Sequence, residues 1–108
     1  MVESMKTVRV ASFSKYPGGR FASRGGVRAP YSGEEFRESV LRPALNEADV
    51  VTVDFVGAVT VIPSFVDEAL GPFVEKMGKE EFRRRVKWKV DPASDVLRFI
   101  EDTIAKRS

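Results

Sequence analysis

The sequence predicts a small α/β domain with a mixed central sheet of about four strands and three helices. Residues 50–56 are a near-continuous run of apolar and β-branched side chains, which is typical of a strand covered on both faces. Strand-like and helix-like segments alternate with short links, which favours parallel neighbours and right-handed crossovers. A length of 108 residues suits one compact unit, so we expect residues 1–108 to form a single domain.

The first expected elements are two strands. Residues 7–13 alternate apolar and polar side chains, with Val8 and Val10 facing inward, and predict the first strand. Residues 20–24 predict a second, short strand that is closed by Gly25-Gly26. Together these segments would form a hairpin at the edge of the domain.

The first helix is expected to begin at the segment Ser32-Gly33-Glu34-Glu35. A hydroxyl and a carboxylate three residues apart form a capping box, and acidic side chains occupy the first turn. Pro43 predicts a kink or an early end of this helix. The apolar residues at helical spacing are Phe36, Val40, Leu41 and Leu45.

The central strand, residues 50–57, leads through Pro63 to a second helix. We expect Ser64 to be the N-cap of this helix, where its oxygen would accept a bond from an unpaired backbone N–H. The helix dipole favours negative charge at this end, so a phosphate or an acidic group is expected to bind there. Gly71-Pro72 is expected to interrupt the helix, and Gly78 to end it. Its apolar residues are Phe65, Ala69, Leu70, Phe73, Val74 and Met77.

The last elements are a strand and a helix. Residues 79–83 predict a short turn, and residues 85–90 alternate charged and apolar side chains as a strand does, with Val86, Trp88 and Val90 inward. Asp91-Pro92 would supply the cap and first residue of a C-terminal helix. The apolar stripe of that helix is Val96, Phe99, Ile100, Thr103 and Ile104.

Composition excludes several classes of protein. The chain has no cysteine and no histidine, which excludes disulfide frameworks, thiolate or imidazole metal sites, and Ser-His-Asp hydrolysis. A net charge of +2 gives no overall basic field for nucleic acid. No apolar run is long enough to span a bilayer, and the first residues lack the apolar core of a signal peptide. We therefore expect a cytoplasmic protein with no cofactor, no metal and no membrane contact.

Five segments together resemble a known family. They are Gly19-Arg20, Ser23-Arg24, Ser32-Gly33-Glu34-Glu35-Phe36-Arg37, Val53-Asp54-Phe55-Val56-Gly57 and Pro63-Ser64-Phe65-Val66-Asp67-Glu68-Ala69-Leu70-Gly71. The resemblance is to STAS-like domains of unknown function, relatives of the sulphate transporter and anti-sigma factor antagonist domains, and it covers most of the chain. It implies a STAS-like fold, in which helices pack against a central sheet.

The resemblance also implies a site and a partner. In the anti-sigma factor antagonists, a partner kinase of the histidine-kinase ATPase fold phosphorylates a serine at the start of the helix after the central strand. Ser64 occupies the matching place, preceded by Pro63 where those antagonists usually carry Asp. The family is similar to modules that are encoded beside, or fused to, histidine-kinase-type ATPases, so such an ATPase is the expected partner.

The first functional hypothesis is therefore a non-enzymatic regulatory module that binds a protein around Ser64. Phosphorylation would add about −1.5 to −2 charges there and switch the binding. Under the alternative reading, Ser64 only caps a helix and is never phosphorylated. The expected partner-binding residues are Phe65, Asp67, Glu68, Arg20 and Arg24.

Two further hypotheses remain. In a nucleic-acid-binding protein, the basic residues 83–89, together with Arg20, Arg24 and Arg28, would neutralise phosphates. However, strand alternation places Trp88 inward and leaves the charged side chains on a solvated face. Nucleic acid is therefore the less favoured partner. An enzyme or small-ligand binder would use Arg20, Arg24, Asp54, Asp67 and Glu68. Adjacent carboxylates on a helix project in different directions, and Asp54 could instead pair with Arg20 or Arg24, which gives it a structural or anion-pairing role.

Overall fold

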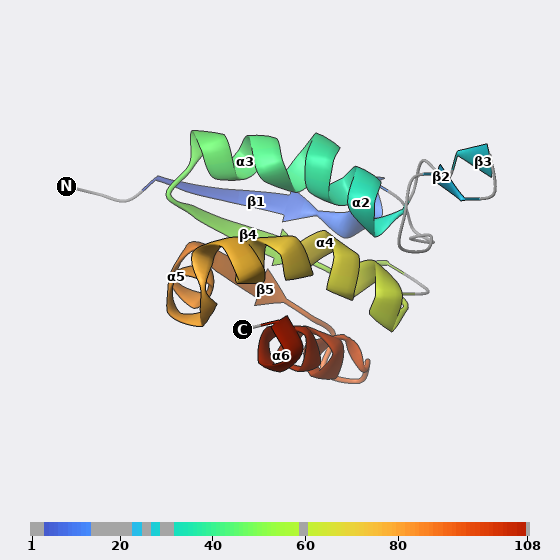
Figure 1. Cartoon of the computed structure of the whole chain (residues 1–108). Helices are drawn as coiled ribbons and strands as arrows, with labels where there is room; N and C mark the ends of the chain where they lie inside the picture. The colour runs from blue at the N-terminus through green and yellow to red at the C-terminus, as the bar shows by residue number, and fades with distance from the viewer. Residues whose placement is uncertain (1–3, 14–22, 25–26, 29–31, 59–60, 108) are drawn as a thin grey trace.

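The fold is that of a computed structural model, which describes residues 4–13, 23–24, 27–28, 32–58 and 61–107. Figure 1 shows the central sheet with helices arranged along its strands. None of the helices in this part of the chain combines the length and the apolar character that crossing a membrane requires.

The central sheet has three parallel strands in the order β1-β4-β5, namely β1 (Met5–Arg9), β4 (Val50–Asp54) and β5 (Val86–Lys89). The expected mixed sheet of about four strands was therefore wrong, although the small α/β class is confirmed. The first strand also ends earlier than predicted, because residues Val10–Phe13 form a single helical turn, α1. In register across the sheet, Val8 lies beside Val53, and Val53 lies beside Trp88.

A small hairpin lies apart from this sheet. Its strands β2 (Ser23–Arg24) and β3 (Val27–Arg28) pair with each other in antiparallel fashion and form a separate two-stranded sheet. The predicted strand over residues 20–24 is thus present in its last two residues, while residues 20–22 lie outside the described residues. The hairpin projects beyond the end of the helix layer in Figure 1.

The first long helix is continuous in spite of Pro43. It consists of α2 (Gly33–Phe36), a π-helical turn η1 (Arg37–Leu41) and α3 (Arg42–Glu47). The predicted cap is confirmed, since the Ser32 hydroxyl accepts a hydrogen bond of 3.1 Å from the Glu35 N–H. The predicted early end was wrong, because the helix continues through Pro43 to Glu47. A wider π turn precedes the proline, which lacks an N–H and lies in the first turn of α3.

The remaining helices are α4 (Pro63–Met77), α5 (Lys79–Arg85) and α6 (Val96–Arg107). Helix α4 runs without interruption through Gly71-Pro72, contrary to the prediction, and the turn expected at residues 79–83 is a full helix. Gly78, with a φ of 83°, ends α4 as predicted. The cap expected at Asp91-Pro92 was wrong: Asp91 closes a turn by accepting from the Ala93 N–H, and the helix begins at Val96.

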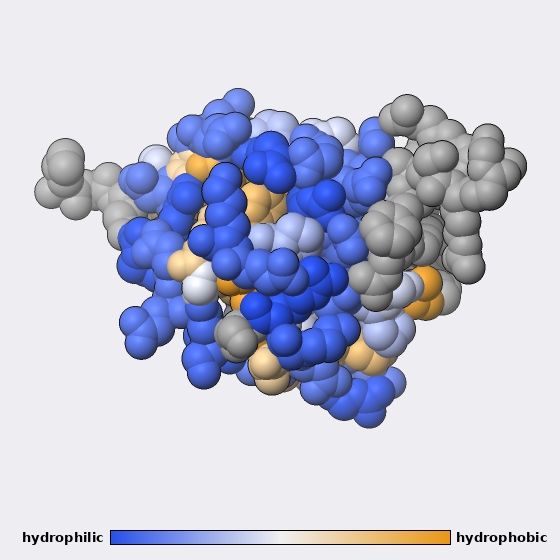
Figure 2. All heavy atoms as spheres, in the orientation of Figure 1, coloured by the Kyte–Doolittle hydropathy of each residue, from blue (hydrophilic) through white to orange (hydrophobic). Residues whose placement is uncertain are grey.

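Helices α2–α3, α4 and α6 form one layer over one face of the sheet (Figure 1). The strand residues that point into this layer join the helices in one hydrophobic core, in which the rings of Phe36 and Phe65 contact each other at an interplanar angle of 47°. The layer presents a mostly hydrophilic outer surface in Figure 2. The strand residues of the core are Val8, Val51, Val53 and Val86.

Candidate functional site

Ser64 lies at the second residue of α4, not at its N-cap. The N-cap is Ile62, whose side chain makes no capping bond, and Pro63 is the first helical residue. The predicted cap was therefore wrong, because proline fits best at the first helical position, which makes Ser64 the second residue of the helix. Ser64 is half-buried, and its hydroxyl makes no hydrogen bond to any described residue. The hydroxyl is thus not committed to holding the helix end.

Ser64 begins a polar stripe along α4. Ser64, Glu68, Gly71 and Glu75 follow one another at spacings of four, three and four residues, so they lie on the same side of the helix. Asp67 lies beside this stripe. The opposite side of α4 belongs to the core and carries Val66, Ala69, Leu70, Phe73 and Val74.

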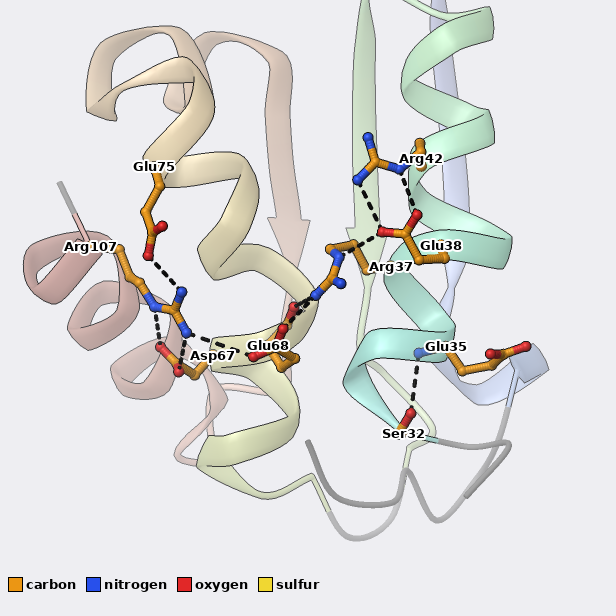
Figure 3. A network of polar contacts seen from close by, with 9 residues as sticks. All are labelled: Ser32, Glu35, Arg37, Glu38, Arg42, Asp67, Glu68, Glu75 and Arg107. Carbon is orange, nitrogen blue, oxygen red and sulfur yellow. Dashed lines mark hydrogen bonds and ion pairs between the residues drawn. The ribbon is translucent and has the colours of Figure 1, made fainter. Parts of the chain in front are cut away.

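Arg37 crosses to α4 from the first helix (Figure 3). Its Nη1 donates to the Glu68 carboxylate Oε1 and to the Glu68 backbone carbonyl, both at 2.7 Å. That carbonyl lies four residues before Pro72, whose missing N–H leaves it without its usual helical donor. Arg37 thus replaces the lost backbone hydrogen bond and pairs with the neighbouring carboxylate, which explains how α4 continues through a proline.

Arg107 reaches the same stripe from the other side (Figure 3). It makes two hydrogen bonds with Asp67, of 3.2 and 2.7 Å, and one of 2.6 Å with Glu75. The Asp67 bond raises the pKa of Arg107 above its ordinary value. Arg107 lies directly over Gly71, where an added Cβ would come within 2.8 Å of the guanidinium carbon. Arg37 and Arg107 therefore join the first helix, α4 and α6 across the outer side of the layer.

Glu38 extends this network and gives a testable titration. Hydrogen bonds from Arg42 and Arg37 lower the pKa of Glu38 from 4.5 to about 2. The folded state favours the charged form of Glu38. The stability that its hydrogen bonds to Arg42 and Arg37 contribute is therefore present above pH 4.5 and is lost as the pH falls toward 2. We expect Arg42→Ala to raise the pKa of Glu38, measured by carbon NMR of the carboxyl, and to flatten the pH dependence of unfolding in this window. An unchanged pKa would contradict the assigned cause.

A hollow of about 290 Å³ lies between the first turns of α4 and the middle of α6. It is close to Ser64 in the chain, since Pro63 lines it. Cations and carboxylates both border the hollow, so it suits a polar side chain of a partner better than an apolar ligand. The lining residues are Pro63, Asp67, Arg98, Phe99, Asp102, Thr103 and Lys106. The described part of the chain holds no group of three or more carboxylates, histidines or cysteines that could bind a metal ion.

The structure places the other predicted site residues in different surroundings. Phe65 is 0% exposed and belongs to the core, so it offers no surface to a partner, contrary to our expectation. Asp67 and Glu68 are only 4% and 9% exposed, because the arginines cover them. Asp54 accepts a hydrogen bond from the Val56 N–H, and its described ionic partner is Arg9 at 3.8 Å. Arg20 and the side chain of Arg24 lie outside the described residues.

The basic segment 83–89 is largely used within the fold. Arg83 pairs with Glu101 at 2.8 Å, and Arg84 pairs with Glu81. Arg85 donates to the carbonyls of Leu45, Ala48 and Asp49, at and just after the end of α3. Trp88 is half-buried and stacks on Phe82. This arrangement gives no exposed aromatic platform for a nucleic-acid base.

Sequence reasoning missed Arg37 and Arg107 as parts of the site. They lie 31 and 40 residues from their carboxylate partners on α4. Helical spacing along α4 finds the stripe of Ser64, Glu68 and Glu75, but nothing local shows which cations cross it. The Gly71-Pro72 pair was the sequence signal for such a contact. Glycine leaves space for a guanidinium group, and the missing proline N–H leaves a helix carbonyl that a guanidinium can bond.

Comparison with known proteins identifies the family. No curated protein and no solved structure matches the chain. Residues 32–91, more than half of the chain, match the model of the STAS-like domain of unknown function (DUF4325). The match includes the first long helix, the central strand and α4, while the segments Gly19-Arg20 and Ser23-Arg24 lie outside it. The expected resemblance is thus confirmed, and the chain belongs to the family of STAS-like domains of unknown function.

Proposed function

We propose that this domain is a non-enzymatic regulatory module that binds a protein partner around the start of α4 and is switched by phosphorylation of Ser64. The observation that carries the proposal is the position of Ser64. It is partly exposed, its hydroxyl has no partner among the described residues, and it lies at the positive end of a helix of 15 residues. A phosphate at this position would meet a favourable helix dipole.

The ion pairs beside Ser64 supply the switch. Ser64 and Glu68 are neighbours one helical turn apart, about 5–6 Å between Cβ atoms. A phosphate on Ser64 would repel the Glu68 carboxylate and compete with it for Arg37, whose charge-assisted bonds can transfer to phosphate oxygens. The link between the first helix and α4 would then loosen. In this way a single modification would change the surface between the first helix and α4, next to Ser64.

The expected partner is a histidine-kinase-type ATPase. This part of the proposal rests on the family, since modules of this type resemble domains that are encoded beside or fused to such ATPases. The same ATPase would act as the kinase and as the binding partner. Its docking surface would include the exposed Pro63 and the residues of α6 that border the hollow.

The test is a phosphorylation assay with the ATPase encoded nearest to this protein. The purified chain is incubated with that ATPase and ATP, and phosphate is located by mass spectrometry. We expect modification of Ser64 in the wild-type chain and none in Ser64→Ala, with Ser94→Ala as the control because Ser94 is an exposed serine on a different turn. Phosphate on Ser94 alone, or none on Ser64 together with unchanged binding of Ser64→Ala, would end the proposal.

The two readings of Ser64 also differ in stability. If the Ser64 hydroxyl capped the helix, Ser64→Ala would lower the free energy of unfolding by about 1 kcal/mol. Since the hydroxyl makes no capping bond, we expect a change within about 0.5 kcal/mol. Ser32→Ala is the matched control, because Ser32 is an N-cap with a formed bond, and it should cost about 1 kcal/mol. Equal losses in both variants would contradict this assignment.

A further inference from the structure

The face of the sheet turned away from the helix layer carries polar and charged side chains. Strand alternation and register place them in rows across β1, β4 and β5. One row is Thr7, Thr52 and Lys87, and the next is Arg9, Asp54 and Lys89. Thr7, Lys87 and Lys89 are exposed, and the Arg9 side chain is 57% exposed. At the start of the first strand, Met5 on the same face is 74% exposed. Val50, in register beside Met5, lies on this face as well and is 5% exposed. We call these eight residues the outer sheet face.

An open face is unusual for this type of sheet. Sheets made only of parallel strands occur almost always with both faces covered, whereas antiparallel sheets commonly leave one face to water. Here all three strands are parallel, and the described helices cover one face. The exposure of Met5, Thr7 and both lysines shows that no described segment covers the other. This combination indicates a surface that another molecule covers.

The charges of the outer sheet face indicate which kind of molecule would bind there. Three cations, Arg9, Lys87 and Lys89, stand against one carboxylate, Asp54. The Asp54 side chain is only 12% exposed, and it already accepts a hydrogen bond from the Val56 N–H, so the cations dominate the accessible surface. A second copy of this face would bring like charges together. A single-stranded nucleic acid would need aromatic side chains for stacking, and the eight residues of this face include none.

We propose that the outer sheet face is a docking surface for an acidic protein segment, which lies across the strands and pairs with Arg9, Lys87 and Lys89. The two threonines, which share a row with Lys87, supply hydroxyls for its backbone. This surface is separate from Ser64, because it lies on the opposite side of the sheet from α4. The proposal therefore does not depend on phosphorylation or on an ATPase partner.

The test uses the full chain labelled with nitrogen-15 and a peptide of five Glu-Thr repeats, whose glutamates share one side when it is extended. At low ionic strength, we expect the peptide to shift the amide signals of Thr7, Arg9, Thr52, Lys87 and Lys89, and the matching Gln-Thr peptide to leave them unchanged. The double variant Lys87→Glu, Lys89→Glu should weaken binding about tenfold. Shifts confined to the helix layer would overturn the proposal.

The control is the double variant Lys76→Glu, Lys79→Glu, which makes the same change of charge on two exposed lysines of α4 and α5. It should retain binding within about twofold. An equal loss in both variants would show attraction to net charge alone and would overturn the proposal. Tighter binding of an oligothymidine of equal charge at the same residues, or shifts that depend on protein concentration without peptide, would also overturn it. The spectra of the free variants establish that each remains folded.

Discussion

Replacing Phe65 with Ala is expected to lower the free energy of unfolding by about 3–5 kcal/mol. Phe65 is 0% exposed, and its ring centroid lies 5.8 Å from that of Phe36 and 6.5 Å from that of Phe13. Truncation would remove these contacts and leave a cavity where α4 meets the first helix. Since small domains have only about 5–15 kcal/mol of stability, the loss should appear as a much lower urea midpoint.

This experiment separates two roles for the residue after Ser64. As a partner contact, Phe65 would be exposed, and its removal would weaken binding while leaving stability unchanged. Leu97→Ala is the control, because Leu97 is a large apolar residue with 47% exposure on α6, and its loss should change stability by no more than about 0.5 kcal/mol. A stable Phe65→Ala variant would show that the ring is not packed as described.

The length of a periodic segment decides how well its structure could be predicted. The central strand, the first long helix, α4 and α6 were all expected, because their apolar residues repeat over many positions. Residues Val10–Phe13 were expected in a strand but form a helical turn. Val10 and Phe13 are three residues apart, a spacing that also fits one turn of helix, so four residues could not distinguish the two.

The local sequence around the two prolines did not show that their helices continue. Locally, a proline inside a helix removes one donor and predicts an interruption. At Pro72, the carbonyl that loses its donor belongs to Glu68 and is bonded by Arg37 from another helix. At Pro43, a π-helical turn precedes the proline. A contact over 31 residues cannot be derived from local sequence, so the continuity of α4 had to come from the structure.

The candidate site, too, could be predicted only in part from the sequence. The sequence located Ser64 at the start of the second helix, because a strand that ends in breakers and then an apolar stripe marks such a position. It could not show that Asp67 and Glu68 are covered, since their partners Arg107 and Arg37 lie 40 and 31 residues away, in α6 and in the first long helix. The charges that were expected to face a partner are instead used to hold three helices together beside Ser64.

Replacing Gly33 with Ala is expected to lower the free energy of unfolding by about 2–3 kcal/mol. In a helix this change normally stabilises a protein, by about 0.4–1 kcal/mol, because alanine reduces the entropy of the unfolded chain. At Gly33, however, an added Cβ would lie 2.5 Å from the Phe65 carbonyl oxygen and 3.1 Å from the Ala69 nitrogen. Both atoms belong to the backbone of α4, which cannot move aside without shifting the helix that carries Ser64. Urea unfolding measures the effect.

Gly71→Ala is the matched control for Gly33→Ala. Its added Cβ would also meet an atom at 2.8 Å, but that atom belongs to the Arg107 side chain, which can swing into solvent. The gain in helix propensity, about 1 kcal/mol, should offset the weakened ion pairs, so the net change should stay within about 1 kcal/mol. A loss at Gly71 as large as that at Gly33 would show that Arg107 is held rigidly. An unchanged free energy of unfolding in Gly33→Ala would show that the start of the first helix does not lie as close to α4 as the structure places it.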